Sequence, residues 1–215
     1  ALEHALAEVR PGWTEWQIRR LIRARLDELS EGESFPTIVA TGPNASRCHH
    51  EPSERRWAAG EPLLIDMGAV VDRYCSDLTR VVWSGRMSRP WRELYRHVDE
   101  ARAAAIAAIR PGMSGHDVDV VARRRLREAG LARLFGHGLG HGVGLEIHEF
   151  PRLGPKSEDR LEAGMVVTIE PGVYLPGEGG IRIEDLVLVT ERGAEVLSST
   201  PREQKWCPAA GSRRE

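Results

Sequence analysis

The sequence predicts an α+β fold built from two related halves, each with two helices followed by a β-hairpin. An Ile-acid-x-Gly segment occurs twice, at residues 65–68 and 169–172, and an Ala-Gly pair lies a few residues before each copy. A second pair of matching segments, Arg-Pro-Gly-x-Thr and Arg-Pro-Gly-x-Ser, begins at Arg10 and at Arg110, an offset of 100 residues. Because both pairs occur in the same order, we expect an internal duplication whose halves are related by a pseudo-twofold axis.

The predicted organisation is one domain over residues 1–205, with halves at about residues 1–90 and 91–200 and a disordered tail at residues 206–215. A chain of 215 residues can bury an ample core. Further matches at the same offset extend the repeat: Ala5/Ala105, Leu6/Ile106, Val9/Ile109, Ile18/Val118, Arg25/Arg125 and Leu26/Leu126.

Composition is that of an ordinary soluble globular protein. Hydrophobic residues make up 41% and charged residues 29%, and the formal net charge of −2 predicts neither a nucleic-acid nor a membrane partner. No segment approaches the roughly 18 apolar residues of a membrane span. Three cysteines without a paired motif, Cys48, Cys75 and Cys207, fit a reduced, cytoplasmic location.

Each half is predicted to begin with two helices. The first of them ends near the Pro-Gly pair, and Thr14 or Ser114 then caps the second. Apolar residues follow both caps at helical spacing: Ile18, Leu21, Ile22 and Leu26 in one half, and Val118, Val121 and Leu126 in the other.

A β-hairpin follows in the first half. Residues 63–71 and 74–83 are rich in apolar and β-branched side chains and flank a short turn at Asp72 and Arg73. This turn sets Asp66 opposite or almost opposite Asp77.

The second half repeats the hairpin around a longer turn. Residues 166–174 and 181–189 flank a segment rich in glycine, and a centre at Gly177 sets Glu170 opposite Glu184. Each half therefore presents a pair of carboxylates, and a pseudo-twofold axis would bring all four together.

Four acids in apolar strands require compensation, because a buried charge is costly unless it is paired. A shared divalent metal site is the preferred explanation. One alternative is pairing with arginines, for which Arg182 is placed near Glu184. A calcium site is a second alternative, but the histidine content and the ligand spacing argue against it.

A segment that alternates glycine with larger residues, residues 136–144, supplies histidines. In an extended backbone the period of two places His137 and His141 on one face. The alternative is a flexible glycine-rich loop whose histidines are incidental. Carboxylates with an imidazole favour Mn²⁺, Co²⁺, Fe²⁺ or Zn²⁺, and no cysteine is needed.

Five segments in order resemble the "pita-bread" metallopeptidases of the creatinase, aminopeptidase P and prolidase family. They are residues 65–68, 74–80, 137–141, 168–172 and 181–185, within a similarity that covers about residues 1–200. The sequences at residues 76–80, 170–174 and 182–185 resemble the prolyl-peptidase branch of that family. The resemblance implies a curved antiparallel sheet at the centre of the fold and a single catalytic domain.

The resemblance also implies the role of each site residue. Asp66 and Asp77 would bind one metal ion, His141 and Glu170 the other, and Asp77 and Glu184 would bridge the two. The catalytic set would be His49, His148, Glu170 and Arg182, and the substrate-binding set would be His49, His137, His148, Tyr174 and Arg182. The cofactors would be two divalent ions, with Mn²⁺ or Co²⁺ preferred and Zn²⁺ or Fe²⁺ as alternatives.

The implied activity is hydrolysis of Xaa-Pro bonds at the N-terminus of short peptides, as an Xaa-Pro dipeptidase (prolidase) or an Xaa-Pro aminopeptidase. Attack by a metal-bridging hydroxide would cleave the bond. A homodimer is expected. The alternatives are an enzyme like methionine aminopeptidase and a non-catalytic binding protein on the same fold. Such prolyl peptidases usually carry an N-terminal domain, which we expect to be absent from this sequence because the catalytic pattern begins at once. The sequence would then be either a trimmed fragment or a compact single-domain member of the family.

Overall fold

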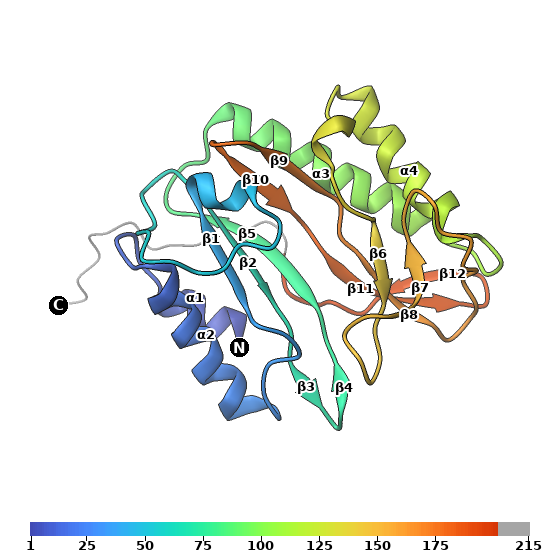
Figure 1. Cartoon of the computed structure of the whole chain (residues 1–215), viewed down its shortest axis with the longest axis horizontal. Coiled ribbons are helices and arrows are strands. Elements are labelled where there is room, and N and C mark those ends of the chain that lie inside the picture. Colours follow the sequence, from blue (N-terminus) through green and yellow to red (C-terminus); the bar gives the residue numbers. More distant parts are fainter. Residues whose placement is uncertain (202–215) are drawn as a thin grey trace.

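The computed structural model describes residues 1–201, and its elements form two halves that meet at a central group of strands (Figure 1). The tail predicted at residues 206–215 lies outside the described residues. Among residues 1–201, no helix combines the length and the apolar character that a membrane crossing requires.

The two predicted helices open each half. The first half contains α1 (Leu2–Glu8) and α2 (Glu15–Leu29), and the second contains α3 (Arg89–Ala108) and α4 (Gly115–Glu128). Both predicted caps are confirmed as reciprocal capping boxes. Thr14 exchanges hydrogen bonds with Gln17 at the start of α2, and Ser114 does so with Asp117 at the start of α4.

Strands follow the helices in each half. The first sheet has the order β1-β2-β5, from β1 (Ile38–Thr41), β2 (Pro62–Met67) and β5 (Leu78–Trp83). The second has the order β12-β11-β8-β6-β7, from β6 (Gly140–Gly142), β7 (Glu149–Leu153), β8 (Val166–Ile169), β11 (Asp185–Thr190) and β12 (Gly193–Val196). Two short hairpins and two 3₁₀ turns complete the described part: β3 (Val70–Val71) with β4 (Tyr74–Cys75), β9 (Gly172–Leu175) with β10 (Gly179–Arg182), η1 (Gly42–Ser46) and η2 (Ala132–Leu134).

Matching hydrogen bonds confirm that the halves are related. The Arg56 guanidinium donates to the Gly12 carbonyl at 2.7 Å, and the Arg160 guanidinium donates to the Gly112 carbonyl at the same distance. The two Arg-Pro-Gly turns are therefore held by the same device in each half, which a chance similarity of sequence would not produce.

The second hairpin has the predicted register. Leu175 lies opposite Gly179, so the turn is centred on Gly177, and Ile169 lies opposite Asp185 further along. Glu170 and Glu184 are the next residues in this register. Each predicted strand is, however, interrupted at its acid. The first ends at Ile169 and resumes at Gly172, and the second ends at Arg182 and resumes at Asp185.

The first hairpin differs in detail from its prediction. Its turn lies at Asp72 and Arg73, but Asp66 pairs with Thr79, and Asp77 precedes β5. Gly68 lies at the break between β2 and β3 and packs closely on the other strand, because a Cβ there would lie 1.9 Å from the Ser76 carbonyl oxygen. The two acids are thus offset by two residues along the hairpin, and this separation reduces their direct repulsion.

Strand β2 is buried on both faces. Leu63 and Ile65 pack in the core beneath α1 and α2, whereas Leu64 packs in the core that includes α3 and α4. Side chains alternate along a strand, so Asp66 shares the face of Leu64 and points toward the second half.

Candidate metal centre

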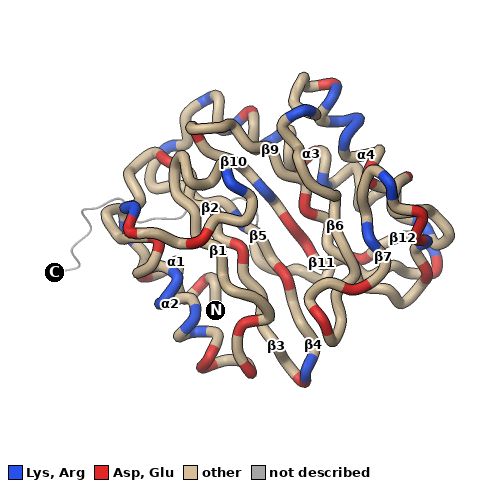
Figure 2. Tube along the Cα trace, in the orientation of Figure 1, with Lys and Arg blue, Asp and Glu red and all other residues tan. Residues whose placement is uncertain are grey.

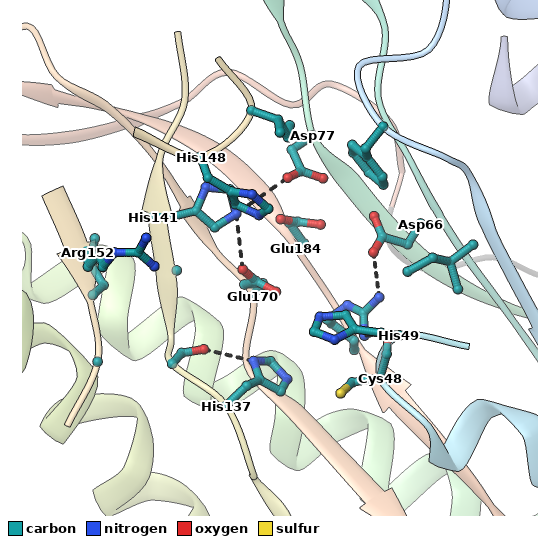
Figure 3. A pocket seen from close by; sticks show the side chains of 18 residues that line it. Cys48, His49, Asp66, Asp77, His137, His141, His148, Arg152, Glu170 and Glu184 are labelled. Carbon is teal, nitrogen blue, oxygen red and sulfur yellow. Dashed lines mark hydrogen bonds and ion pairs between the residues drawn. The ribbon is translucent and has the colours of Figure 1, made fainter. Parts of the chain in front are cut away.

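A cavity of about 400 Å³ lies between the halves and gathers most of the predicted site residues (Figure 3). All five predicted metal ligands line it: Asp66, Asp77, His141, Glu170 and Glu184. His49, His137, His148 and Arg182 line it as well. Tyr174 is not part of the lining, but its hydroxyl contacts Arg182 and His137 behind the wall.

The acids of the second half lie where their hairpin opens. The Glu170 amide donates to the Leu139 carbonyl at 2.9 Å, and the Glu184 amide donates to the Thr79 carbonyl at 3.2 Å. The Thr79 hydroxyl also donates to Glu184, at 2.7 Å. The backbones of the two acids therefore bond to other segments and not to each other across the hairpin. Glu184 in particular is hydrogen-bonded to β5 of the first half, which follows Asp77.

His141 is oriented as a neutral ligand. Its Nδ1 donates to the Gly142 carbonyl at 3.0 Å, which leaves Nε2 without a proton and 3.6 Å from Asp77 and 3.5 Å from Glu170. Burial lowers the pKa of this imidazole to about 4. Gly140 lets the backbone before His141 lie close to β8, since a Cβ at this position would lie 2.0 Å from the Thr168 carbonyl oxygen.

The carboxylates are short of positive charge. Burial raises the pKa of Asp77 to about 9 and that of Glu170 to about 8, with repulsion from Asp66 adding to both shifts. Burial and the charge of Asp77 also raise the pKa of Glu184. A cluster of acids that resists ionisation in this way is suited to bound cations.

The donor geometry fits divalent ions. One ligand atom each from Asp77, His141 and Glu184 lies within 4.8 Å of the others, close enough to share an ion. Asp66 Oδ1 is buried and has no hydrogen-bond partner within residues 1–201. Oxygen donors with one imidazole match Mn²⁺, Co²⁺, Fe²⁺ or Zn²⁺.

Pairing with arginine accounts for one of the four acids. Arg182 Nη2 lies 2.5 Å from Asp66 Oδ2. Among residues 1–201, no ion pair joins an arginine to Asp77, Glu170 or Glu184, so the alternative of simple arginine pairing leaves three acids uncompensated.

Behind Arg182, a directed chain of hydrogen bonds runs to His137. The His137 Nδ1 donates to the Gly138 carbonyl at 2.8 Å, so its Nε2 accepts from the Tyr174 hydroxyl at 2.8 Å. The same hydroxyl accepts from Arg182 Nη1 at 2.8 Å. Burial lowers the pKa of His137 to about 4 and raises that of Tyr174, so both groups are neutral at pH 7.

Two further histidines face the cavity from different sides. The rings of His148 and His141 meet edge to face with centroids 4.4 Å apart. His49 enters from the opposite side, on the segment between β1 and β2 (Figure 3). His49 from the first half and His148 from the second therefore line the same cavity as the acids.

Sequence reasoning missed several residues around the site. Arg152 lines the cavity, and within residues 1–201 its guanidinium has no hydrogen-bond or ion-pair partner. Asp185 binds both Arg80 (2.8 Å) and Arg102 (2.6 Å) in a buried network next to Glu184. Arg152 lies only four residues after the predicted site residue His148, and this proximity could have identified it. Arg102 lies within a helix, far in the sequence from any predicted site residue, and had no such signal.

The fold and the donor set together define a metal-binding site of the kind that metal-dependent hydrolases use. The sequence model of Metallopeptidase family M24 matches residues 1–191, and the chain therefore belongs to this family. Its fold is the pita-bread fold of that family.

Individual relatives agree with this assignment. The chain is 43% identical over 195 residues to an Xaa-Pro dipeptidase of Pyrococcus furiosus, a match that covers 88% of this chain and 56% of that protein. An X-Pro aminopeptidase structure from Thermotoga maritima superposes with a TM-score of 0.92 at 38% identity, covering 94% of this chain and 58% of that one. An Xaa-Pro dipeptidase structure from Bacillus anthracis superposes with a TM-score of 0.91 at 39% identity, covering 94% of this chain and 57% of that one. The chain thus spans a little over half the length of the relatives it matches.

Proposed function

We propose that this chain is the catalytic part of a dinuclear metal-dependent peptidase that hydrolyses Xaa-Pro bonds at the N-terminus of short peptides. The observation that carries the proposal is the convergence of Asp66, Asp77, His141, Glu170 and Glu184 on one cavity between the halves. An Xaa-Pro dipeptidase and an Xaa-Pro aminopeptidase are both compatible with this site.

Each half would contribute to both ions. Asp66 and Asp77 would hold one, His141 and Glu170 the other, and Asp77 and Glu184 would bridge them, with Mn²⁺ or Co²⁺ preferred over Zn²⁺ or Fe²⁺. When bound, such ions lower the pKa of water and polarise a carbonyl group. The raised pKa values of Asp77 and Glu170 support this assignment, because bound cations would provide the missing positive charge.

The surrounding residues would hold the peptide. His49 and His148 line the cavity together with the acids and would bind the reacting peptide group, donating to the oxygen that gains charge. Glu170 would carry a proton to the departing nitrogen. Arg182, held by Tyr174, would keep Asp66 in place, and the neutral His137 would border the substrate side of the cavity.

The choice of an Xaa-Pro bond rests on the relatives, which are named as Xaa-Pro dipeptidases and an X-Pro aminopeptidase. The test is an assay of metal-loaded protein with an Xaa-Pro dipeptide, an Xaa-Pro-Yaa tripeptide and a Met-Ala peptide. Cleavage of the proline peptides supports the proposal, and the preferred length separates dipeptidase from aminopeptidase. Cleavage of Met-Ala alone would support the methionine-aminopeptidase alternative, and no turnover of any peptide would support a binding protein.

A homodimer and a cytoplasmic location remain our predictions for the whole protein, as does a single domain over residues 1–205. Acidic and basic positions alternate along the Cα trace of residues 1–201 (Figure 2), which agrees with the expectation of a small peptide as substrate rather than a nucleic acid.

A further inference from the structure

Glu15 is a fully buried carboxylate at the start of α2, outside the metal centre. Its side chain is 0% exposed. Five groups donate hydrogen bonds to it, one from the last residue of β1 and four from the segment between β1 and β2: the Thr41 amide (2.8 Å), the Asn44 side-chain amide (3.0 Å), His50 Nε2 (2.8 Å), the Ser53 amide (2.9 Å) and the Ser53 hydroxyl (2.6 Å). One carboxylate therefore gathers residues 41–53 from both ends.

These bonds keep Glu15 ionised. Burial alone opposes ionisation, but the hydrogen bonds from Ser53, His50 and Asn44 outweigh it and lower the pKa of this carboxyl. Hydrogen bonds to an ionised acceptor are shorter and stronger than those between neutral groups. The segment is thus fixed to α2 more firmly than backbone contacts alone would hold it.

His49 lies in the middle of the segment that Glu15 holds. Its neighbour His50 points back to Glu15, while the Cys48 carbonyl accepts from Arg182 on the side of the metal centre, at 3.2 Å. The chain is therefore fixed on both sides of His49, whose own side chain lines the cavity.

The second half shows that the duplication itself does not need this carboxylate. Gly115 occupies the matching position, since its amide donates to Asp159 as the Glu15 amide donates to Arg55. A Cβ at Gly115 would lie 2.0 Å from the Arg152 carbonyl oxygen, so this half packs its loop directly against the helix. At this helix-start position, the carboxylate is therefore present in the half that carries His49 and replaced by Gly115 in the other.

We propose that Glu15 is a positioning residue for His49, acting through His50, Asn44 and Ser53 to hold that imidazole over the metal centre. The proposal rests on the proposed peptidase function, in which His49 binds the substrate. It differs from a purely structural role because the effect of Glu15 on catalysis must pass through His49.

A double-mutant cycle tests this dependence. Glu15→Gln in the metal-loaded protein is expected to lower kcat/KM for an Xaa-Pro dipeptide about 10- to 100-fold with unchanged metal content. In a His49→Ala background the same substitution is expected to lower it less than about twofold. An equal loss in both backgrounds would overturn the proposal. Asp119→Asn is the matched control, because Asp119 is equally buried in α4, and its effect should be the same in both backgrounds.

A second measurement does not depend on activity. In hydrogen–deuterium exchange, Glu15→Gln is expected to increase the exchange of amides in residues 42–53 and leave those in residues 152–159 unchanged. Unchanged protection of residues 42–53 would contradict the proposal. If the wild-type protein hydrolyses no Xaa-Pro peptide, the proposed function fails, while this measurement still decides whether Glu15 holds the segment. If Glu15→Gln does not fold, Ser53→Ala removes one side-chain donor and is expected to give the same pattern with a smaller amplitude.

Discussion

The guanidinium of Arg182 lies 2.5 Å from the carboxylate of Asp66, so a buried cation of the second half meets a predicted metal ligand of the first. Arg182 is held in turn by the Tyr174 hydroxyl and by the Thr79 hydroxyl. One arginine thus supplies positive charge to a cavity with four carboxylates, and bound cations would supply the rest.

Substituting Arg182 by Met is expected to destabilise the metal-free protein by about 3–5 kcal/mol, because it leaves buried acids uncompensated. The loss in metal-loaded protein should be smaller, since cations remain beside the acids. Thermal unfolding with a chelator and with Mn²⁺ measures both. Arg160→Met removes a hydrogen bond distant from the acids, so it should lower the free energy of unfolding by the same amount in metal-free and in metal-loaded protein. An equal loss for Arg182→Met in the two states would contradict this account.

Stability of the metal-free protein should fall as the pH rises from about 7 to about 9. Asp77 and Glu170 have pKa values raised to about 9 and about 8, so the folded state holds protons that the unfolded chain has released, and it loses them in this window. His137 and His141, with pKa values lowered to about 4, act in the opposite direction only below about pH 6.5. Unfolding midpoints in chelator check the slope. Saturating Mn²⁺ should abolish the slope, because metal binding displaces these protons and leaves the acids ionised in both the folded and the unfolded state. A midpoint in chelator that rises with pH would count against the prediction.

Two Asp→Asn substitutions should have opposite effects on the metal-free protein at pH 8. Asp77→Asn should raise the unfolding midpoint, by roughly 2–4 °C for each kcal/mol gained, because at pH 8 the folded state must hold this buried carboxyl protonated, whereas the unfolded chain ionises it and Asn needs no proton. Asp185→Asn should lower it, since Arg80 and Arg102 lose their shared partner. Asp77→Asn should also abolish metal binding and activity together. Full activity in this variant would disprove its assignment as a bridging ligand.

Arg152 offers a test of substrate length. Its guanidinium lines the cavity without a partner in the described chain, and a free carboxylate would match it. Arg152→Met should raise KM for an Xaa-Pro dipeptide about tenfold, and much less for the same dipeptide with an amidated C-terminus. Steady-state kinetics with the two peptides measure the difference. Equal changes for both peptides would show that Arg152 does not read the terminal carboxylate.

The sequence predicted the parts of the site that depend on local periodicity. The turn at Gly177 determined the register of Glu170 and Glu184, because the side-chain period of a strand is two. Asp66 and Asp77 were less well predicted, because Asp66 pairs with Thr79 and the strands are interrupted at Gly68, where the chain packs closely against Ser76.

Long-range contacts could not be predicted in the same way. Glu15 reads as the first residue of a capped helix, and its five donors lie between 26 and 38 residues away. Arg102 reads as one of many helical arginines, although it binds Asp185, 83 residues away. Such partners depend on how segments distant in the sequence pack together, which the pattern along one segment does not encode.

The most direct test of the central claim is a metal titration of chelator-treated protein, followed by binding calorimetry and by hydrolysis of an Xaa-Pro peptide in parallel. The account predicts two Mn²⁺ or Co²⁺ ions per chain, with activity appearing as the site fills, and loss of both signals in Glu184→Gln. Binding that is unchanged in Glu184→Gln, or a filled two-ion site that hydrolyses no Xaa-Pro peptide, would contradict it.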